Sequence, residues 1–242
     1  MFGFNFDKRM LYILIGAVVV LFMANMGTDG LMGLLLTLPG VVIAITFHEF
    51  AHAYSAYKLG DDTPVYQGRL NLNPLSHIDP LGLAMLIIAH FGWGKPVQIN
   101  PNNFRGKYSI SASEAIVSVA GPLMNFLVAL VFAIVYAVII KFAGFQFMLT
   151  SMGNIVLSII QYTIVVNIGL GVFNLIPLPP LDGSKVLMHF LPYNAKVWFE
   201  SKENIFYFAF LILFVTGIAG TIISPIINVI YYGIMDLVGI LF

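Results

Sequence analysis

The sequence predicts an all-α, polytopic membrane protein with about six transmembrane helices and one insertion between the second and third helices. Of the 242 residues, 60% are hydrophobic and only 9% are charged, and the mean hydropathy is +0.94. Soluble domains carry about 25% charged residues, so this chain has too few to cover a water-facing surface. Its apolar residues also form long runs bounded by Gly, Pro and charge, near the ~20 residues that a spanning helix needs.

The charge balance and the lack of cysteine exclude several classes of protein. There are 11 basic and 11 acidic residues, so the formal net charge is zero and nothing indicates a nucleic-acid partner. With no cysteine in the chain, disulfides and thiolate metal sites are excluded.

The apolar runs predict the spans in order, within a single transmembrane domain over 1–242. Lys8 and Arg9 before the first run resemble the start of a signal peptide. The run has no small-residue cleavage pattern and leads into a second apolar run, so we expect an uncleaved span. The short connections "GTDG" and "TIISP" predict tight hairpins. The expected spans are 10–27, 31–57, 112–140, 152–176, 204–221 and 225–241.

The segment 58–111 differs from the rest because it is rich in turn-forming and polar residues. The pieces "QGRLNLNP" and "KPVQINP" partly alternate and predict short strands. Between them, the apolar stretch 81–91 is too short to cross a bilayer, so we expect a re-entrant or interfacial segment. Such backbone is tolerated at membrane depth only where protein shields it or where it lines a cavity.

The distribution of basic residues predicts the orientation of the chain. If six spans start from a cytoplasmic N-terminus, 1–9, 58–111 and 177–203 lie in the cytoplasm. These segments hold ten of the eleven Lys and Arg residues, and only Lys141 falls outside. Cytoplasmic loops are enriched in Lys and Arg, so we expect both termini on the cytoplasmic side.

The stretch "HEFAH" at the end of the second expected span predicts a metal site. His48 and His52 are separated by four residues, so they share one helical face and can bind one metal ion. Glu49 lies about 100° around the helix, where it can act on a metal-bound water without being a ligand, as in zinc hydrolases. Ionisable groups in a span cost a few kcal/mol each, which favours a functional role over three satisfied polar residues.

A catalytic zinc needs a third protein ligand, which the spacing alone does not identify. Asp182 stands out because Pro177, Pro179 and Pro180 prevent a regular helix before it, so an irregular segment could return to the histidines. Equally, Asp182 could be the N-cap of the next helix. The other candidates are His77, His90, His189, Asp79, Glu114, Glu200 and Glu203.

Three motifs in order resemble the site-2 protease family of intramembrane zinc metalloproteases. They are "HEFAH", "GPLMN" (121–125) and "NLIPLPPLDG" (174–183). The resemblance covers roughly 40–190 and is closest to the small prokaryotic members without PDZ or CBS domains. Ser184 stands where a second glycine or another small residue is expected, and it is itself small.

The resemblance implies particular roles for the matching residues. His48, His52 and Asp182 would bind one Zn²⁺ per chain, and Glu49 would be the catalytic acid and base. Asn174 would bind substrate or stabilise the oxyanion, although it could also cap a helix. Asn125 could bind substrate or simply form a hydrogen bond to a neighbouring helix.

The resemblance also implies a substrate-clamping role for 64–100, through pairing of a strand with an unwound substrate backbone. His77 and His90 could hold a second metal, but loop histidines more often form hydrogen bonds or face solvent.

We therefore expect a multi-pass zinc endopeptidase, in a prokaryotic cell membrane, whose active site opens to the cytoplasm. Its partners would be the lipid bilayer and membrane proteins with a transmembrane segment, cleaved in regulated intramembrane proteolysis. One alternative is a metal-ion transporter, which would need polar groups at several depths. A non-catalytic scaffold that binds partner helices is another, although it would have no need of an open metal site.

Overall fold

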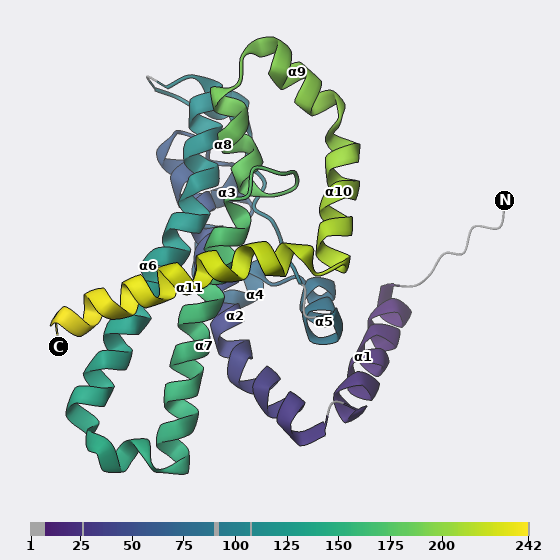
Figure 1. Ribbon diagram of the computed structural model, residues 1–242. Coiled ribbons are helices and arrows are strands. Elements are labelled where there is room, and N and C mark those ends of the chain that lie inside the picture. Colours follow the sequence, from purple (N-terminus) through teal and green to yellow (C-terminus); the bar gives the residue numbers. More distant parts are fainter. Residues whose placement is uncertain (1–7, 26, 90–91, 107, 242) are drawn as a thin grey trace.

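All regular structure in the described part of the chain is helical. The computed structural model describes residues 8–25, 27–89, 92–106 and 108–241 (Figure 1). Four of its helices are long and apolar enough to cross a membrane. They are α2 (Gly27–Lys58), α6 (Ile110–Met148), α7 (Ser151–Asn174) and α11 (Ile218–Leu241). The all-α, multi-pass prediction is thus confirmed, whereas the count of six spans is not; α10 (Glu203–Val215) is only 13 residues long, and α1 (Lys8–Asn25) is helical but is not one of these four.

Helices α2, α6 and α7 pack side by side and alternate in direction (Figure 1). Small residues allow the close approach, as is common between membrane helices. A methyl group added at Gly40 of α2 would lie 2.8 Å from the Cα atom of Thr163 in α7. Similarly, a methyl group at Gly171 of α7 would lie 2.9 Å from the ring of Phe126 in α6. The backbones are therefore nearly in contact, which holds the registers of the three helices.

The insertion between α2 and α6 contains short helices in place of the expected strands. They are α3 (Thr63–Tyr66), α4 (Pro74–His77), α5 (Pro80–Ala89) and the 3₁₀ turn η1 (Pro101–Asn103). The only pairing in this part of the described chain is an isolated bridge between Ile78 and Gly94. Segment 94–100 is extended, but the N–H groups of Val97 and Asn100 are bound by side-chain carboxylates, so no ladder forms. The apolar stretch that begins at 81 forms most of α5, and His90 lies outside the described residues.

The C-terminal part differs from the expected hairpin at "TIISP". The chain forms α8 (Asp182–Phe190), α9 (Tyr193–Ser201) and α10, and then bends at Gly217, whose φ of 74° favours glycine. Helix α11 then continues through Pro225 and crosses α6 and α7 (Figure 1). Ile223 and Val238 of α11 join the buried core formed by α6 and α7. The observed break is thus at the glycine and not at the proline.

Candidate metal centre

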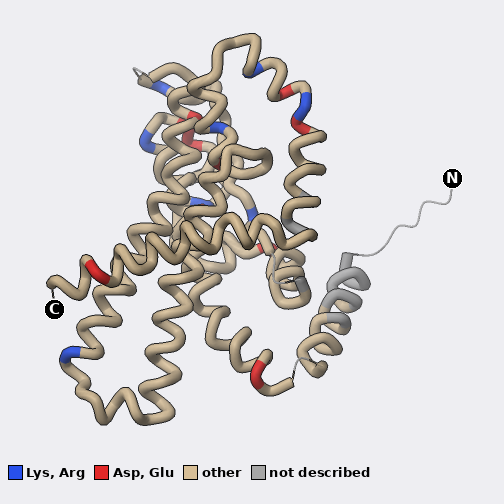
Figure 2. Tube along the Cα trace, viewed as in Figure 1, with Lys and Arg blue, Asp and Glu red and all other residues tan. Residues whose placement is uncertain are grey.

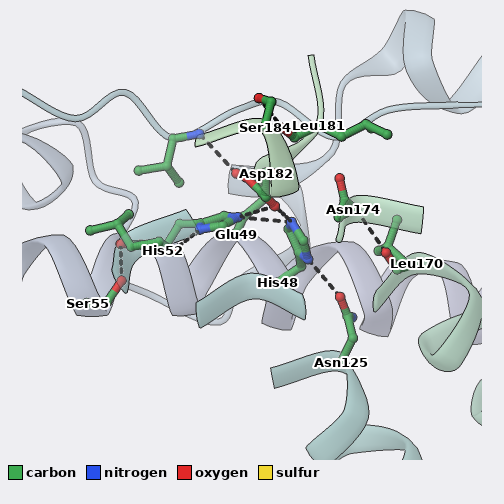
Figure 3. Close-up of polar contacts among 12 residues, drawn as sticks. His48, Glu49, His52, Ser55, Asn125, Leu170, Asn174, Leu181, Asp182 and Ser184 are labelled. Atoms are coloured by element: carbon green, nitrogen blue, oxygen red, sulfur yellow. Dashed lines mark hydrogen bonds and ion pairs between the residues drawn. The ribbon is translucent and has the colours of Figure 1, made fainter. Parts of the chain in front are cut away.

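The two histidines of "HEFAH" lie on one face of α2, as their spacing predicts. The Nε2 atoms of His48 and His52 are 3.0 Å apart, and the two residues are only 5% and 9% exposed (Figure 3). Helix α6 passes directly over the pair at Gly121. A methyl group there would lie 2.5 Å from His52 Nε2 and 2.7 Å from His48 Cε1. Only a glycine at this position leaves room for both imidazoles.

The far nitrogen of each imidazole is held by α6. His48 Nδ1 lies 2.7 Å from Asn125 Oδ1, and His52 Nδ1 lies 2.7 Å from the carbonyl oxygen of Val117. A carbonyl oxygen only accepts, so His52 Nδ1 must carry the proton. Asn125 uses its amide group to donate to the Ala44 carbonyl and to Asn167 Oδ1, so its oxygen faces His48 and accepts in turn. Both Nε2 atoms are then left with free lone pairs.

Asp182 reaches the histidines from the start of α8. The chain leaves α7 and turns through 175–181, and the N-cap of α8 is Leu181, so Asp182 is not the cap that the sequence also allowed. A methyl group at Gly183 would lie 2.3 Å from the Leu175 carbonyl oxygen, which shows how closely this turn folds back. Asp182 Oδ2 lies 3.1 Å from His48 Nε2 and 3.2 Å from His52 Nε2 (Figure 3).

The three side chains fit a bound zinc ion. Oδ2 of Asp182 is buried and accepts no hydrogen bond, so three electron-rich atoms face one another. Ligands at about 2.0–2.1 Å from a tetrahedral zinc lie roughly 3.3 Å apart, close to the observed separations. A zinc ligand must be deprotonated, and the protons assigned to Nδ1 of both histidines leave their Nε2 atoms able to bind the ion.

Glu49 lies beside the cluster and is not part of it. Its Oε2 atom accepts a hydrogen bond from the backbone N–H of Val97 at 2.9 Å. A cavity of about 720 Å³ opens along this side of the histidines. Its walls are mainly apolar and come from the extended segment 94–100 and from α2, α5, α6, α7, α8, α10 and α11, with residues such as Leu86, Phe173 and Ile227. The arrangement places one carboxylate and three potential metal ligands in the lining of an apolar cavity.

The other expected site residues take separate positions. Asn174, the last residue of α7, lines the cavity, and its amide donates to the Leu170 carbonyl (Figure 3). Asn125 is fully buried, and its contacts are with α2 and α7, the neighbouring-helix alternative that the sequence left open. His77 is also buried and pairs with the Asn71 carbonyl. The cluster found in the described part of the chain holds none of His77, His189, Asp79, Glu114, Glu200 and Glu203.

Sequence reasoning missed several groups that shape this site. Gly121, Asn167 and the backbone N–H of Val97 carried no expectation of their own. One signal was available: Gly121 and Asn125 are four residues apart on α6, the same spacing as the two histidines that they face. The amide of Val97 could not be found this way, because any residue except proline offers one.

Comparison with known proteins gives consistent matches. Residues 84–217 match peptidase family M50. The "Putative zinc metalloprotease YwhC" of Bacillus subtilis is 35% identical over 188 residues, which are 78% of this chain and 84% of that protein. The "Putative zinc metalloprotease Rip2" of Mycobacterium tuberculosis is 30% identical over 210 residues, 85% of this chain and 74% of that protein. No solved structure matches the chain.

Proposed function

Because the chain belongs to peptidase family M50, we propose that this membrane zinc metalloprotease cleaves peptide bonds in or beside transmembrane segments of other membrane proteins. The observation that carries the proposal is the place of the metal site. His48 and His52 lie inside α2, a helix apolar enough to span a membrane. Two more candidate spans, α6 and α7, pack against α2, and the fourth, α11, packs against α6 and α7. The cavity beside the site is lined mainly by apolar side chains from these helices. A substrate segment suited to such a cavity is itself apolar.

We assign one Zn²⁺ per chain to His48, His52 and Asp182. The bound ion would polarise the scissile carbonyl and lower the pKa of a water molecule towards about 7. Glu49, beside the cluster with its carboxylate at the cavity wall, would take the proton from the attacking water and return one to the leaving amine. Proton transfer of this kind contributes about 10²- to 10⁴-fold to the rate.

Asn174 is the proposed donor for the oxyanion that forms at the scissile carbonyl. It lines the cavity together with the metal ligands. Its amide now donates to the Leu170 carbonyl within the same helix, and a rotation of the side chain would free it. The contact between Asn125 Oδ1 and His48 Nδ1 supports a role for Asn125 in orienting His48, and not in binding substrate.

The charge distribution supports an active site that opens to the cytoplasm. Lys and Arg gather around the insertion, α8 and α9, at one end of the bundle (Figure 2). Lys141 instead lies near the C-terminal end of α6, far along the helix from Gly121 and Asn125 beside the histidines. Because basic residues are enriched on the cytoplasmic side, this distribution supports a site near that face, where water for hydrolysis is available.

We propose that segment 94–100 holds the substrate during regulated intramembrane proteolysis, and its position beside the cavity supports this role. A helical substrate hides its carbonyl groups in hydrogen bonds, so part of it must unwind before attack. The segment is extended and lines the cavity with Val97 and Ile99, while Gln98 is exposed. An unwound substrate could pair along its outer edge, as in other cases of strand addition.

The test is cleavage of a co-expressed single-span membrane protein by the unaltered enzyme and by Glu49→Gln. We expect cleavage by the unaltered enzyme and a loss of at least about 100-fold in Glu49→Gln, because the amide cannot accept the proton. Zinc content should be unchanged. Equal cleavage by the two proteins would contradict the assignment of Glu49.

A further inference from the structure

Glu49, the proposed general base, is hydrogen-bonded to a segment that is distant in sequence. Glu49 Oε2 accepts a hydrogen bond from the N–H of Val97, in the middle of the extended segment 94–100. The segment lies very close to α2 because residue 94 is glycine. A methyl group at Gly94 would lie 2.6 Å from Ile45 Cγ2 and 3.6 Å from Glu49 Oε1. The backbone of this segment therefore forms one wall around the carboxylate.

The two ends of the segment are held by separate contacts. At the start, Lys95 donates its N–H to the His77 carbonyl at 2.7 Å, and its own carbonyl accepts from the Arg69 guanidinium at 3.4 Å. At the end, the N–H of Asn100 donates to Asp61 Oδ2 at 2.7 Å. The segment is thus anchored on both sides of the bond to Glu49, which limits its sliding along α2.

Two of the anchors are buried charged residues that the hydrolytic mechanism does not use. Asp61 is fully buried, and Arg69 is 6% exposed. Burying a charge is costly unless hydrogen bonds replace the lost water. Asp61 meets this need with Oδ1, which accepts from Thr63 and Asn103, and with Oδ2, which accepts from Asn100. Arg69 donates to the carbonyls of Ser76 and Lys95.

We propose that segment 94–100 is the positioning element of the general base: the N–H of Val97 fixes one oxygen of Glu49, and Asp61 and Arg69 fix the ends of the segment. The proposal rests on the proposed function of Glu49. Because Oε2 is held by the backbone, Oε1 is the oxygen left to exchange the proton with water. The rate of the proton transfer then depends on Asp61 and Arg69, which are neither metal ligands nor part of the cavity lining.

A matched pair of substitutions at residue 97 tests the bond directly. Val97→Pro removes the N–H, because proline has no backbone donor. Val97→Ala keeps the N–H and removes a similar part of the side chain. We expect Val97→Pro to lower kcat by about 10- to 100-fold, the effect of misplacing a reacting group by about 1 Å. KM and zinc content of Val97→Pro should stay within about twofold, and its kcat should fall well below that of Val97→Ala, because only Val97→Pro loses the N–H.

A second pair tests the anchor and guards against a folding defect at residue 97. Asp61→Asn can keep Oδ1 as an acceptor but places an NH₂ group against the N–H of Asn100, so it breaks the link to the segment. Thr63→Val removes one hydrogen bond to the other oxygen of Asp61 and leaves the link intact. We expect Asp61→Asn to lower kcat by about three- to tenfold, with KM and zinc content unchanged. Thr63→Val should keep nearly full kcat.

Each result supports or overturns the proposal. The proposal is supported if kcat is lower in Val97→Pro than in Val97→Ala, and lower in Asp61→Asn than in Thr63→Val, with zinc bound and KM unchanged. An equal kcat in Val97→Pro and Val97→Ala overturns it. The proposed function would still stand in that case if the unaltered enzyme cleaves the substrate and Glu49→Gln does not. A rise in KM with kcat unchanged also overturns it, because that result assigns the segment to substrate binding alone. If the unaltered enzyme cleaves nothing, the proposed function and this inference both fail.

Discussion

Asn125→Leu should weaken zinc binding, although Asn125 does not touch the metal. The substitution preserves most of the side-chain volume and removes every hydrogen bond made by the amide. Two groups would then lack a partner: the Nδ1–H of His48 and the Oδ1 atom of Asn167. The Ala44 carbonyl lies inside α2 and retains its helical partner.

The expected size of the effect follows from these contacts. Asn125 is fully buried, so water cannot replace the lost partners. Each buried polar group without a partner costs about 1–3 kcal/mol, so the apo protein should lose roughly 2–6 kcal/mol of stability. Loss of the group that orients a metal-binding histidine typically costs about 10- to 100-fold in metal affinity. That change corresponds to about 1.4–2.7 kcal/mol of binding free energy.

The assay is the zinc Kd of purified protein in detergent, measured by competition with a chromophoric chelator. Asn167→Leu is the matched control, because it is one contact further from the metal on the same chain of hydrogen bonds. It should destabilise the fold but leave the His48–Asn125 bond, and its zinc Kd should change by less than about threefold. Equal zinc affinity in Asn125→Leu and the unaltered protein, or equal losses in the two variants, would refute the reasoning.

Three further changes test other parts of the site. Gly121→Ala should abolish stoichiometric zinc binding, measured by metal analysis, because its methyl group would lie 2.5 Å from His52 Nε2. The control is Gly33→Ala, whose methyl group would have no atom within 4 Å, and this variant should bind zinc normally. Gly183→Ala should lower zinc affinity by more than about tenfold by displacing Asp182, since its methyl group would lie 2.3 Å from the Leu175 carbonyl oxygen; unchanged affinity would argue against that close contact. Asp61 makes stability depend on pH. Burial would raise the pKa of its carboxyl, but hydrogen bonds outweigh burial and lower the pKa below 3.8. The stability that the Asp61 carboxylate adds to the folded protein is therefore complete above about pH 4, and it is lost as the pH falls through the lowered pKa of the folded state. Asp61→Asn should therefore lower Tm at pH 7 and flatten its decline in acid, and parallel Tm curves would contradict this.

The sequence predicts the parts of the fold that depend on local pattern. The apolar runs correspond to α2, α6 and α7, because helix formation in lipid follows from the need to satisfy every backbone group. The break predicted at "TIISP" is wrong, because Gly217 and not Pro225 interrupts the helical run. Pro225 is accommodated inside α11, whereas Gly217 adopts a positive φ and ends the preceding helical run.

Only the part of the metal site that lies on one helix could be predicted from the spacing of its residues. His48 and His52 share a helix, so their spacing alone predicts their proximity. Asp182 belongs to another helix, and only the family resemblance singled it out from the alternative of an N-cap. The bonds from Asn125 to His48 and from Val97 to Glu49 depend on how helices and loops register in three dimensions, which no local pattern encodes.

We propose that Asp182 completes a zinc site with His48 and His52. The most direct measurement is the zinc content of purified Asp182→Asn beside the unaltered enzyme and Glu49→Gln. We expect one zinc per chain in the unaltered enzyme and in Glu49→Gln, and a substoichiometric content in Asp182→Asn, because a neutral amide replaces the ionised ligand. One zinc per chain in Asp182→Asn would show that the third ligand lies elsewhere.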